Sequence, residues 1–215
     1  TYQGMIENRG SHTATMPLNG NILVAGGVTG NETLQTAEIL DPVTHAYTEI
    51  GNMLYARNQH RATLLNDRTV LLTAGSTDAL NLNTAELFDP SDNSFTQVGS
   101  LTDARKSHTA THLLDDRVLV TGGKGARDGD LYTAEIYDPA TQLFHMTGLM
   151  NTNRALHTAS LLDSGQVMVA GGVTTGGVPT PTAELFDPVL ETFSSTGDLN
   201  LQRKRHRASV LPDGN

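Results

Sequence analysis

The chain has 215 residues, of which 37% are hydrophobic and 5% are aromatic, and its formal net charge is −9. This length is sufficient for one or two domains with a hydrophobic core, and the acidic balance argues against binding to nucleic acid or to an anionic membrane surface. The sequence has no cysteine, which excludes disulfides and thiolate metal sites, and it has no apolar run long enough to span a membrane.

One motif, Arg-x-x-His, recurs at a nearly constant interval from the start of the chain to its end. Successive histidines of the motif are 48, 48, 49 and 49 residues apart. A fixed period of this length is typical of a protein built from stacked copies of one supersecondary unit. The five copies are Arg9/His12, Arg57/His60, Arg105/His108, Arg154/His157 and Arg203/His206.

Two further motifs follow Arg-x-x-His in each complete copy. The first is a pair of small residues ending in glycine, at 26–27, 74–75, 122–123 and 171–172. The second is Thr-Ala-Glu, two apolar residues and Asp-Pro, at 36–42, 84–90, 133–139 and 182–188. The complete unit therefore occurs four times, and its fifth copy contains only the first motif.

The predicted elements are clearest in the second repeat. No segment has a helical period of 3.6 residues, and Gly, Pro, Asn or Asp punctuates the sequence at short intervals. The pattern indicates a four-stranded antiparallel meander with short turns. Its strands are expected at residues 58–65, 68–75, 84–89 and 94–98.

Four-stranded units repeated at this period predict an all-β fold, a β-propeller in which each unit is one blade of a single domain spanning residues 1–215. The first strands are small and polar, as the rim of a central channel requires. Residues 1–5 match only the end of a preceding fourth strand, and 203–215 form a partial blade with a first strand and its turn. The complete blades are expected at residues 9–51, 57–99, 105–148 and 154–197.

Together these motifs resemble the kelch repeat, in the variety found in bacterial secreted and galactose-oxidase-like proteins. The sequence departs from the family pattern at Ala74, which replaces one glycine, and at the usual tryptophan, replaced by Tyr47, Phe95, Phe144 or Phe193. The resemblance implies a kelch propeller with an extracellular or cell-surface location. Kelch propellers generally close with more blades than four, so we expect a section of a longer propeller, or copies of the chain that associate to close it.

The periodic charged residues are interpreted as structural. Each Thr-Ala-Glu glutamate shares a strand face with apolar residues, and a buried carboxylate must be paired. The expected partner is the arginine of Arg-x-x-His, and the histidines are expected to hydrogen-bond neighbouring backbone rather than to bind metal. These residues are Arg57, Arg105, Arg154, Arg203, Glu38, Glu86, Glu135, Glu184, His60, His108 and His157.

Candidate binding residues lie in the loops that differ between repeats, namely those between second and third strands and the returns to the next arginine. In a meander both sets emerge at the same end of the blade, and variable loops on a regular scaffold are where binding normally occurs. Free drift of these loops is the alternative, and Asp128-Gly129-Asp130 is more often a turn than a calcium site. The candidates are Asn31, Tyr55, Asp78, Asn81, Arg127, Asp128, Asp130 and Tyr132.

The function expected from these features is a non-catalytic scaffold that binds a protein or a glycan, as part of a larger secreted or surface protein. We expect no catalytic residues, no metal, no cofactor, no nucleic-acid partner and no membrane insertion. One alternative is the propeller of a galactose-oxidase-like enzyme whose catalytic residues lie elsewhere, because the copper site of such enzymes requires a Cys–Tyr cross-link and this sequence has no cysteine. Another is a purely structural self-assembling or engineered repeat array.

Overall fold

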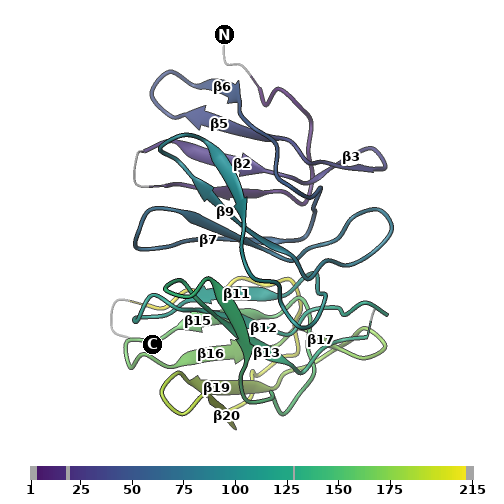
Figure 1. Ribbon diagram of the computed structural model, residues 1–215. Helices are drawn as coiled ribbons and strands as arrows, with labels where there is room; N and C mark the ends of the chain where they lie inside the picture. Colours follow the sequence, from purple (N-terminus) through teal and green to yellow (C-terminus); the bar gives the residue numbers. More distant parts are fainter. Residues whose placement is uncertain (1–3, 18–19, 128, 212–215) are drawn as a thin grey trace.

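The computed structural model describes residues 4–17, 20–127 and 129–211 (Figure 1). These residues form strands, turns and loops, and no helix is present among them. They therefore also contain no helix that is long and apolar enough to cross a membrane. The prediction of an all-β chain is confirmed.

Sixteen of the strands form four separate four-stranded sheets, and each sheet is an antiparallel meander in chain order. The first strands are β1 (Thr13–Thr15), β7 (Arg61–Leu64), β11 (Thr109–His112) and β15 (Thr158–Leu161). The second strands are β2 (Ile22–Ala25), β8 (Val70–Thr73), β12 (Val118–Thr121) and β16 (Val167–Ala170). The third strands are β5 (Ala37–Asp41), β9 (Ala85–Asp89), β13 (Ala134–Asp138) and β19 (Ala183–Asp187). The fourth strands are β6 (Ala46–Glu49), β10 (Ser94–Gln97), β14 (Leu143–Met146) and β20 (Thr192–Ser195).

Two small hairpins extend from loops between second and third strands. In the first blade β3 (Val28–Thr29) pairs with β4 (Glu32–Thr33), and in the fourth blade β17 (Val173–Thr174) pairs with β18 (Val178–Pro179). The equivalent loops of the second and third blades contain only isolated bridges. The loops that differ in sequence therefore also differ in structure.

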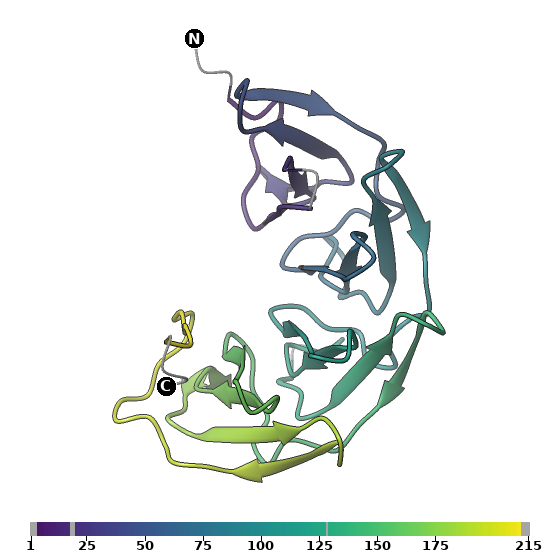
Figure 2. The same ribbon diagram turned by 90° about the vertical axis from the view of Figure 1, so that its left-hand side faces the viewer.

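The four sheets follow one another along an open arc, with the later strands of each sheet on its convex side (Figure 2). Contacts between neighbouring sheets join the first strands, β1 to β7, β7 to β11 and β11 to β15, so these strands lie on the inner side. This arrangement is that of propeller blades around a central channel, as the repeat predicts.

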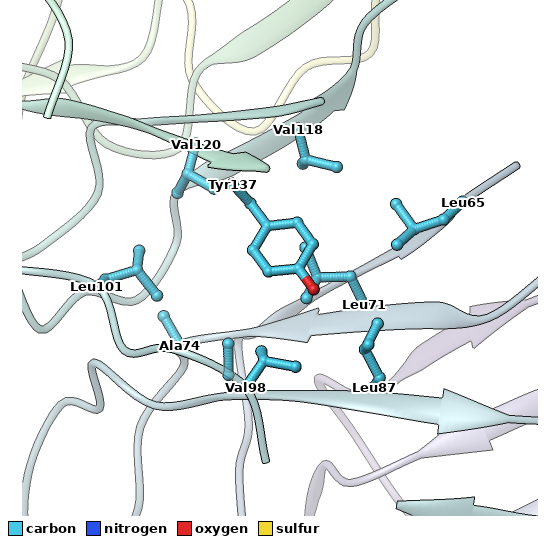
Figure 3. Packing of buried hydrophobic residues seen from close by; sticks show 10 residues of the cluster. Leu65, Leu71, Ala74, Leu87, Val98, Leu101, Val118, Val120 and Tyr137 are labelled. Atoms are coloured by element: carbon cyan, nitrogen blue, oxygen red, sulfur yellow. The ribbon is translucent and has the colours of Figure 1, made fainter. Parts of the chain in front are cut away.

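The hydrophobic core lies between the blades. The second strands are buried along their whole length in the middle blades because a neighbouring sheet covers each face, which is why they read as continuous apolar runs. Between the second and third blades, Leu71 and Leu87 pack on the side of one sheet, and Val118, Val120 and Tyr137 on the side of the next (Figure 3). The fourth strands are largely exposed.

Aromatic side chains fill the outer part of three blades. Each lies on a fourth strand and packs at a tilt against an aromatic residue opposite it on the third strand. The ring centroids are 5.0 Å apart for Phe88 and Phe95, 5.0 Å for Tyr137 and Phe144, and 4.8 Å for Phe186 and Phe193. Such tilted pairs contribute beyond the area they bury.

The expected strands of the partial blades are not formed. Residues 204–211 make no strand, and neither do residues 4–5, while 1–3 and 212–215 lie outside the described residues. The physical reason at the C-terminal end is that a first strand is held by its ladder to the second strand of the same repeat, and no such strand is present in the described part of that repeat. Arg205 and His206 nonetheless bond to the fourth blade.

Candidate functional site

Each complete repeat contains one buried ion pair, and the second repeat illustrates it. Arg57 Nη2 donates to Glu86, and Arg57 Nη1 donates to the carbonyl oxygens of Ala74 at 2.6 Å and Thr84 at 3.2 Å. Both charged side chains are fully buried. Burial lowers the pKa of Arg57, and the charge of Glu86 acts in the opposite direction. A buried guanidinium is tolerated when it is paired and hydrogen-bonded in this way.

The same glutamate holds the loop that enters its blade. Glu86 accepts the backbone N–H groups of Leu54 at 2.6 Å and Tyr55 at 3.2 Å. Glu38, Glu135 and Glu184 accept the equivalent pairs of N–H groups in their own blades. With the arginine, each carboxylate has at least three donors.

The pairing is repeated in the other complete blades but not in the fifth motif. The distances are 2.5 Å for Arg9–Glu38, 2.6 Å for Arg105–Glu135 and 2.7 Å for Arg154–Glu184. Arg203, expected to belong to this structural set, is exposed, and its Nε donates to the carbonyl of Leu201 at 3.3 Å. No copy of Thr-Ala-Glu follows Arg203 in the sequence, so its carboxylate partner is missing.

The repeat histidines join one blade to the preceding one. Nε2 of His60 lies 2.9 Å from Thr13 Oγ1, and Nε2 of His157 lies 3.0 Å from Thr109 Oγ1. Backbone groups were the partners expected for these rings. The structure instead places threonine hydroxyls of the preceding blade at Nε2, because the packing of one blade on the next determines which group faces the ring. Burial, and secondly nearby arginines, lower the pKa values of His60, His108 and His157 well below the usual range. No group of three or more potential metal ligands occurs among the described residues.

The glycine pairs make close contacts between blades possible. The second glycine of each pair donates its N–H to the carbonyl of the next arginine, at 2.9 Å for Gly27 and 2.8 Å for Gly123. A Cβ on Gly123, whose φ is +100°, would lie 2.7 Å from the carbonyl oxygen of Lys106. The first position of the pair has φ near +55° and accepts Ala74 in the second repeat.

A second series of backbone hydrogen bonds links the blades at the channel. The residue before each motif histidine donates its N–H to the carbonyl of the equivalent residue in the preceding blade. All five residues have φ between +52° and +57°. The donors and acceptors are Gln59 to Ser11, Ser107 to Gln59, Leu156 to Ser107 and Arg205 to Leu156, at 3.1, 3.2, 3.0 and 2.9 Å.

Three of the loop residues expected to bind a ligand instead bond within the protein. Asp78 accepts the hydroxyl and the N–H of Thr33 from the first blade. Asn81 donates to the carbonyls of Lys124 at 3.1 Å and Gly125 at 2.6 Å in the third blade. Asp130 accepts from the ammonium group of Lys124 at 3.0 Å. Asp78 and Asn81 thus join loops of neighbouring blades, which sequence spacing does not reveal, whereas Asp130 bonds within its own loop.

The other loop candidates remain accessible. Asn31 and Arg127 are exposed, Tyr55 retains 37% of its exposure and Tyr132 retains 51%. Asp128 lies outside the described residues. No hydrogen bond joins any two of these four within the described part of the chain, so they form a surface rather than a preassembled polar site.

A polar cavity of about 710 Å³ lies against the inner side of the arc, lined mainly by the first strands and the residues just before them. Sequence reasoning missed it, together with its residue Arg61. The available signal is a departure from the repeat, because the residue after the motif histidine is threonine in the first, third and fourth repeats.

Residues 9–54 match the kelch motif. No curated protein matches the chain. Among solved structures, that of YjhT has a TM-score of 0.75 at 12% sequence identity, and the match covers 92% of this chain and 73% of that chain. At this identity the likeness shows the fold alone. The chain is therefore an all-β protein with a kelch motif at residues 9–54 and a kelch propeller-like fold of four four-stranded sheets.

Proposed function

We propose that the chain is a non-catalytic propeller scaffold that binds a protein or a glycan through the loops at one end of its blades. The observation that carries this proposal is that eight of the sixteen exposed large apolar side chains among the described residues, including Tyr55 and Tyr132, lie on these loops. Apolar residues gathered on loops of a rigid scaffold are typical of interaction surfaces. They are Ile6, Leu54, Tyr55, Leu80, Tyr132, Leu149, Val178 and Leu201.

The use of the repeated charged groups supports binding over catalysis. A carboxylate that already accepts an arginine and two backbone N–H groups, as Glu86 does, is poorly placed to act as a general base. The buried histidines are held neutral between blades. The groups that could supply acid–base chemistry are thus engaged in holding the blades together.

A glycan array tests the glycan branch. The double variant Tyr55→Ser/Tyr132→Ser should lose binding, because it removes two exposed tyrosine rings of the described residues on which a sugar could stack. The matched control, Val43→Ser/Val189→Ser, changes side chains that are 85% and 88% exposed at turns between third and fourth strands, and it should bind normally. For the protein branch, a purified candidate partner is titrated against the same three proteins. Equal binding by the two double variants would contradict the proposal, as would the failure of every glycan and protein tested to bind.

Association with further blades or with other copies of the chain is a second candidate, favoured by the backbone series at the channel. Within the described residues, the N–H of Ser11 and the carbonyl of Arg205 have no inter-blade partner, whereas the equivalent groups between them are all bonded. A neighbouring blade at each end would supply these bonds. Light scattering should then give a mass above the 22.9 kDa of one chain, and a monodisperse monomer would exclude association between copies. From the resemblance of its motifs to kelch repeats of bacterial secreted proteins, we also propose that the protein is located outside the cell or at its surface.

A further inference from the structure

The cavity on the inner side of the arc has a charged lining of one sign. Among the described residues, its lining includes Arg61, Arg205 and Arg207, and four histidines, but no aspartate and no glutamate. The chain as a whole has 23 acidic and 14 basic residues. Positive charge is therefore concentrated in the channel of an acidic protein, and such a cavity focuses the field on anions.

Arg61 occupies a position that is threonine in the other three complete repeats. In the first, third and fourth repeats, Thr13, Thr109 and Thr158 bond through Oγ1 to the histidine of the following blade. In the second repeat that bond is absent, and His108 Nε2 bonds instead to Thr73 Oγ1 at 3.1 Å. Blade packing thus uses only the Nε of Arg61, which donates to the carbonyl of His108 in the next blade, and it does not account for the two Nη groups.

The same departure occurs again at Arg207, the equivalent position of the fifth motif. Both arginines line the one cavity. Two substitutions of the same kind, separated by three repeats in the sequence and facing the same space, are more readily explained by a shared ligand than by two independent structural needs.

The guanidinium of Arg61 retains unused donors. Its Nε donates to the carbonyl of His108 at 2.8 Å, while its two Nη groups have no hydrogen-bond or carboxylate partner among residues 4–17, 20–127 and 129–211. Burial, and secondly the charge of Arg207, lower the pKa of Arg61. A bound anion would oppose both effects, since it would pair the partly buried charge of Arg61 and reduce its repulsion by Arg207.

We propose that Arg61 and Arg207 form a binding site for an oxyanion, that is a carboxylate, phosphate or sulfate group, in this cavity. The planar guanidinium donates two parallel hydrogen bonds to such a group. Ser160 also lines the cavity, and its hydroxyl can contribute a further donor. This site lies in the channel and does not depend on the loop surface proposed above.

Isothermal titration calorimetry at low ionic strength and pH 7.5 tests the site, with citrate, inorganic phosphate and sulfate as separate probes that distinguish the anion classes. At least one probe should bind the 215-residue chain. Arg61→Thr, which installs the residue of the other repeats and should fold normally, should weaken that binding by at least about tenfold, the loss expected for charged hydrogen bonds. Arg207→Thr should weaken it in the same direction.

Arg68→Asn is the matched control, because it removes one exposed positive charge from a turn at the other end of the second blade. It should leave binding unchanged. The proposal is overturned if no probe binds at concentrations up to about 10 mM, since a dissociation constant above that value would mean no specific site. It is also overturned if Arg61→Thr binds as tightly as the parent chain, or if Arg68→Asn weakens binding equally, which would indicate only diffuse attraction.

Discussion

Replacing Glu86 with alanine tests whether the buried ion pairs hold the blades together. The change leaves Arg57, with no exposed side-chain surface, without its counter-charge. Breaking a buried pair by removing one partner typically costs about 3–5 kcal/mol. The N–H groups of Leu54 and Tyr55 also lose their acceptor, but they lie on an exposed loop where water can replace it. We therefore expect a loss of about 3–5 kcal/mol in the free energy of unfolding.

Urea denaturation followed by far-ultraviolet circular dichroism measures this loss, because the chain has no tryptophan to report by fluorescence. Unfolding of repeat proteins can deviate from two states, so midpoints are compared only where the slopes agree. Glu49→Ala, an exposed change on the fourth strand of the first blade, is the control and should stay within about 0.5 kcal/mol of the parent.

A double variant separates the pair from its environment. Arg57→Met combined with Glu86→Leu removes both charges, and it should be less destabilised than Glu86→Ala alone, because no unpaired charge is then left buried. A loss below about 0.5 kcal/mol in Glu86→Ala would refute the structural interpretation and would make a functional role of these carboxylates worth testing.

Three further outcomes follow from the packing of the blades. Tyr137→Phe should leave stability unchanged or raise it by about 1 kcal/mol in urea denaturation, because the hydroxyl is buried without a partner in the described structure and burial raises its pKa to about 12. Gly123→Ala should cost at least about 2 kcal/mol, since φ near +100° suits only glycine and a Cβ there would lie 2.7 Å from the carbonyl oxygen of Lys106. Gly197→Ala, at an exposed position where a Cβ would meet nothing within 4 Å, is the control and should change stability by less than about 0.5 kcal/mol; equal losses in the two variants would contradict this. The three buried histidines, His60, His108 and His157, have pKa values well below the unfolded value of 6.5, so their full contribution to the free energy of unfolding is present above that pH. Below it the free energy of unfolding should fall with a limiting slope of about 4 kcal/mol per pH unit. His157→Gln should reduce this slope by about a third. A flat profile between pH 7.5 and 5.5 would show that these rings are accessible to solvent.

The fold and the ion pairs were predictable because both are periodic. Four copies of the motif at one spacing specify a repeated meander, and among the residues that recur in every complete repeat the arginine is the cation available to pair with the buried glutamate. The strand expected at 204–211 and the structural pairing expected of Arg203 are both absent from the described residues, since neither the second strand nor the glutamate of that repeat is present there.

The contacts between loops were not predictable from the sequence. Asp78 bonds to Thr33 and Asn81 to Gly125 across blade boundaries, and these residues do not recur from repeat to repeat. Whether two such side chains meet depends on the angle between neighbouring sheets, which no local pattern encodes. The channel cavity is not marked by any residue that all the repeats share, and Arg61 and Arg207, which line it, are exceptions to the repeat.

The series of backbone hydrogen bonds at the channel has a consequence for how this protein can change over evolutionary time. The five residues that form it are Ser11, Gln59, Ser107, Leu156 and Arg205, and they have little in common chemically. The bond uses only main-chain atoms, so a mutation at any of these positions alters the chemistry at the mouth of the channel while the spacing of the blades is preserved. Duplication of a blade would likewise add one more such residue, and its side chain could change without loss of the backbone hydrogen bond.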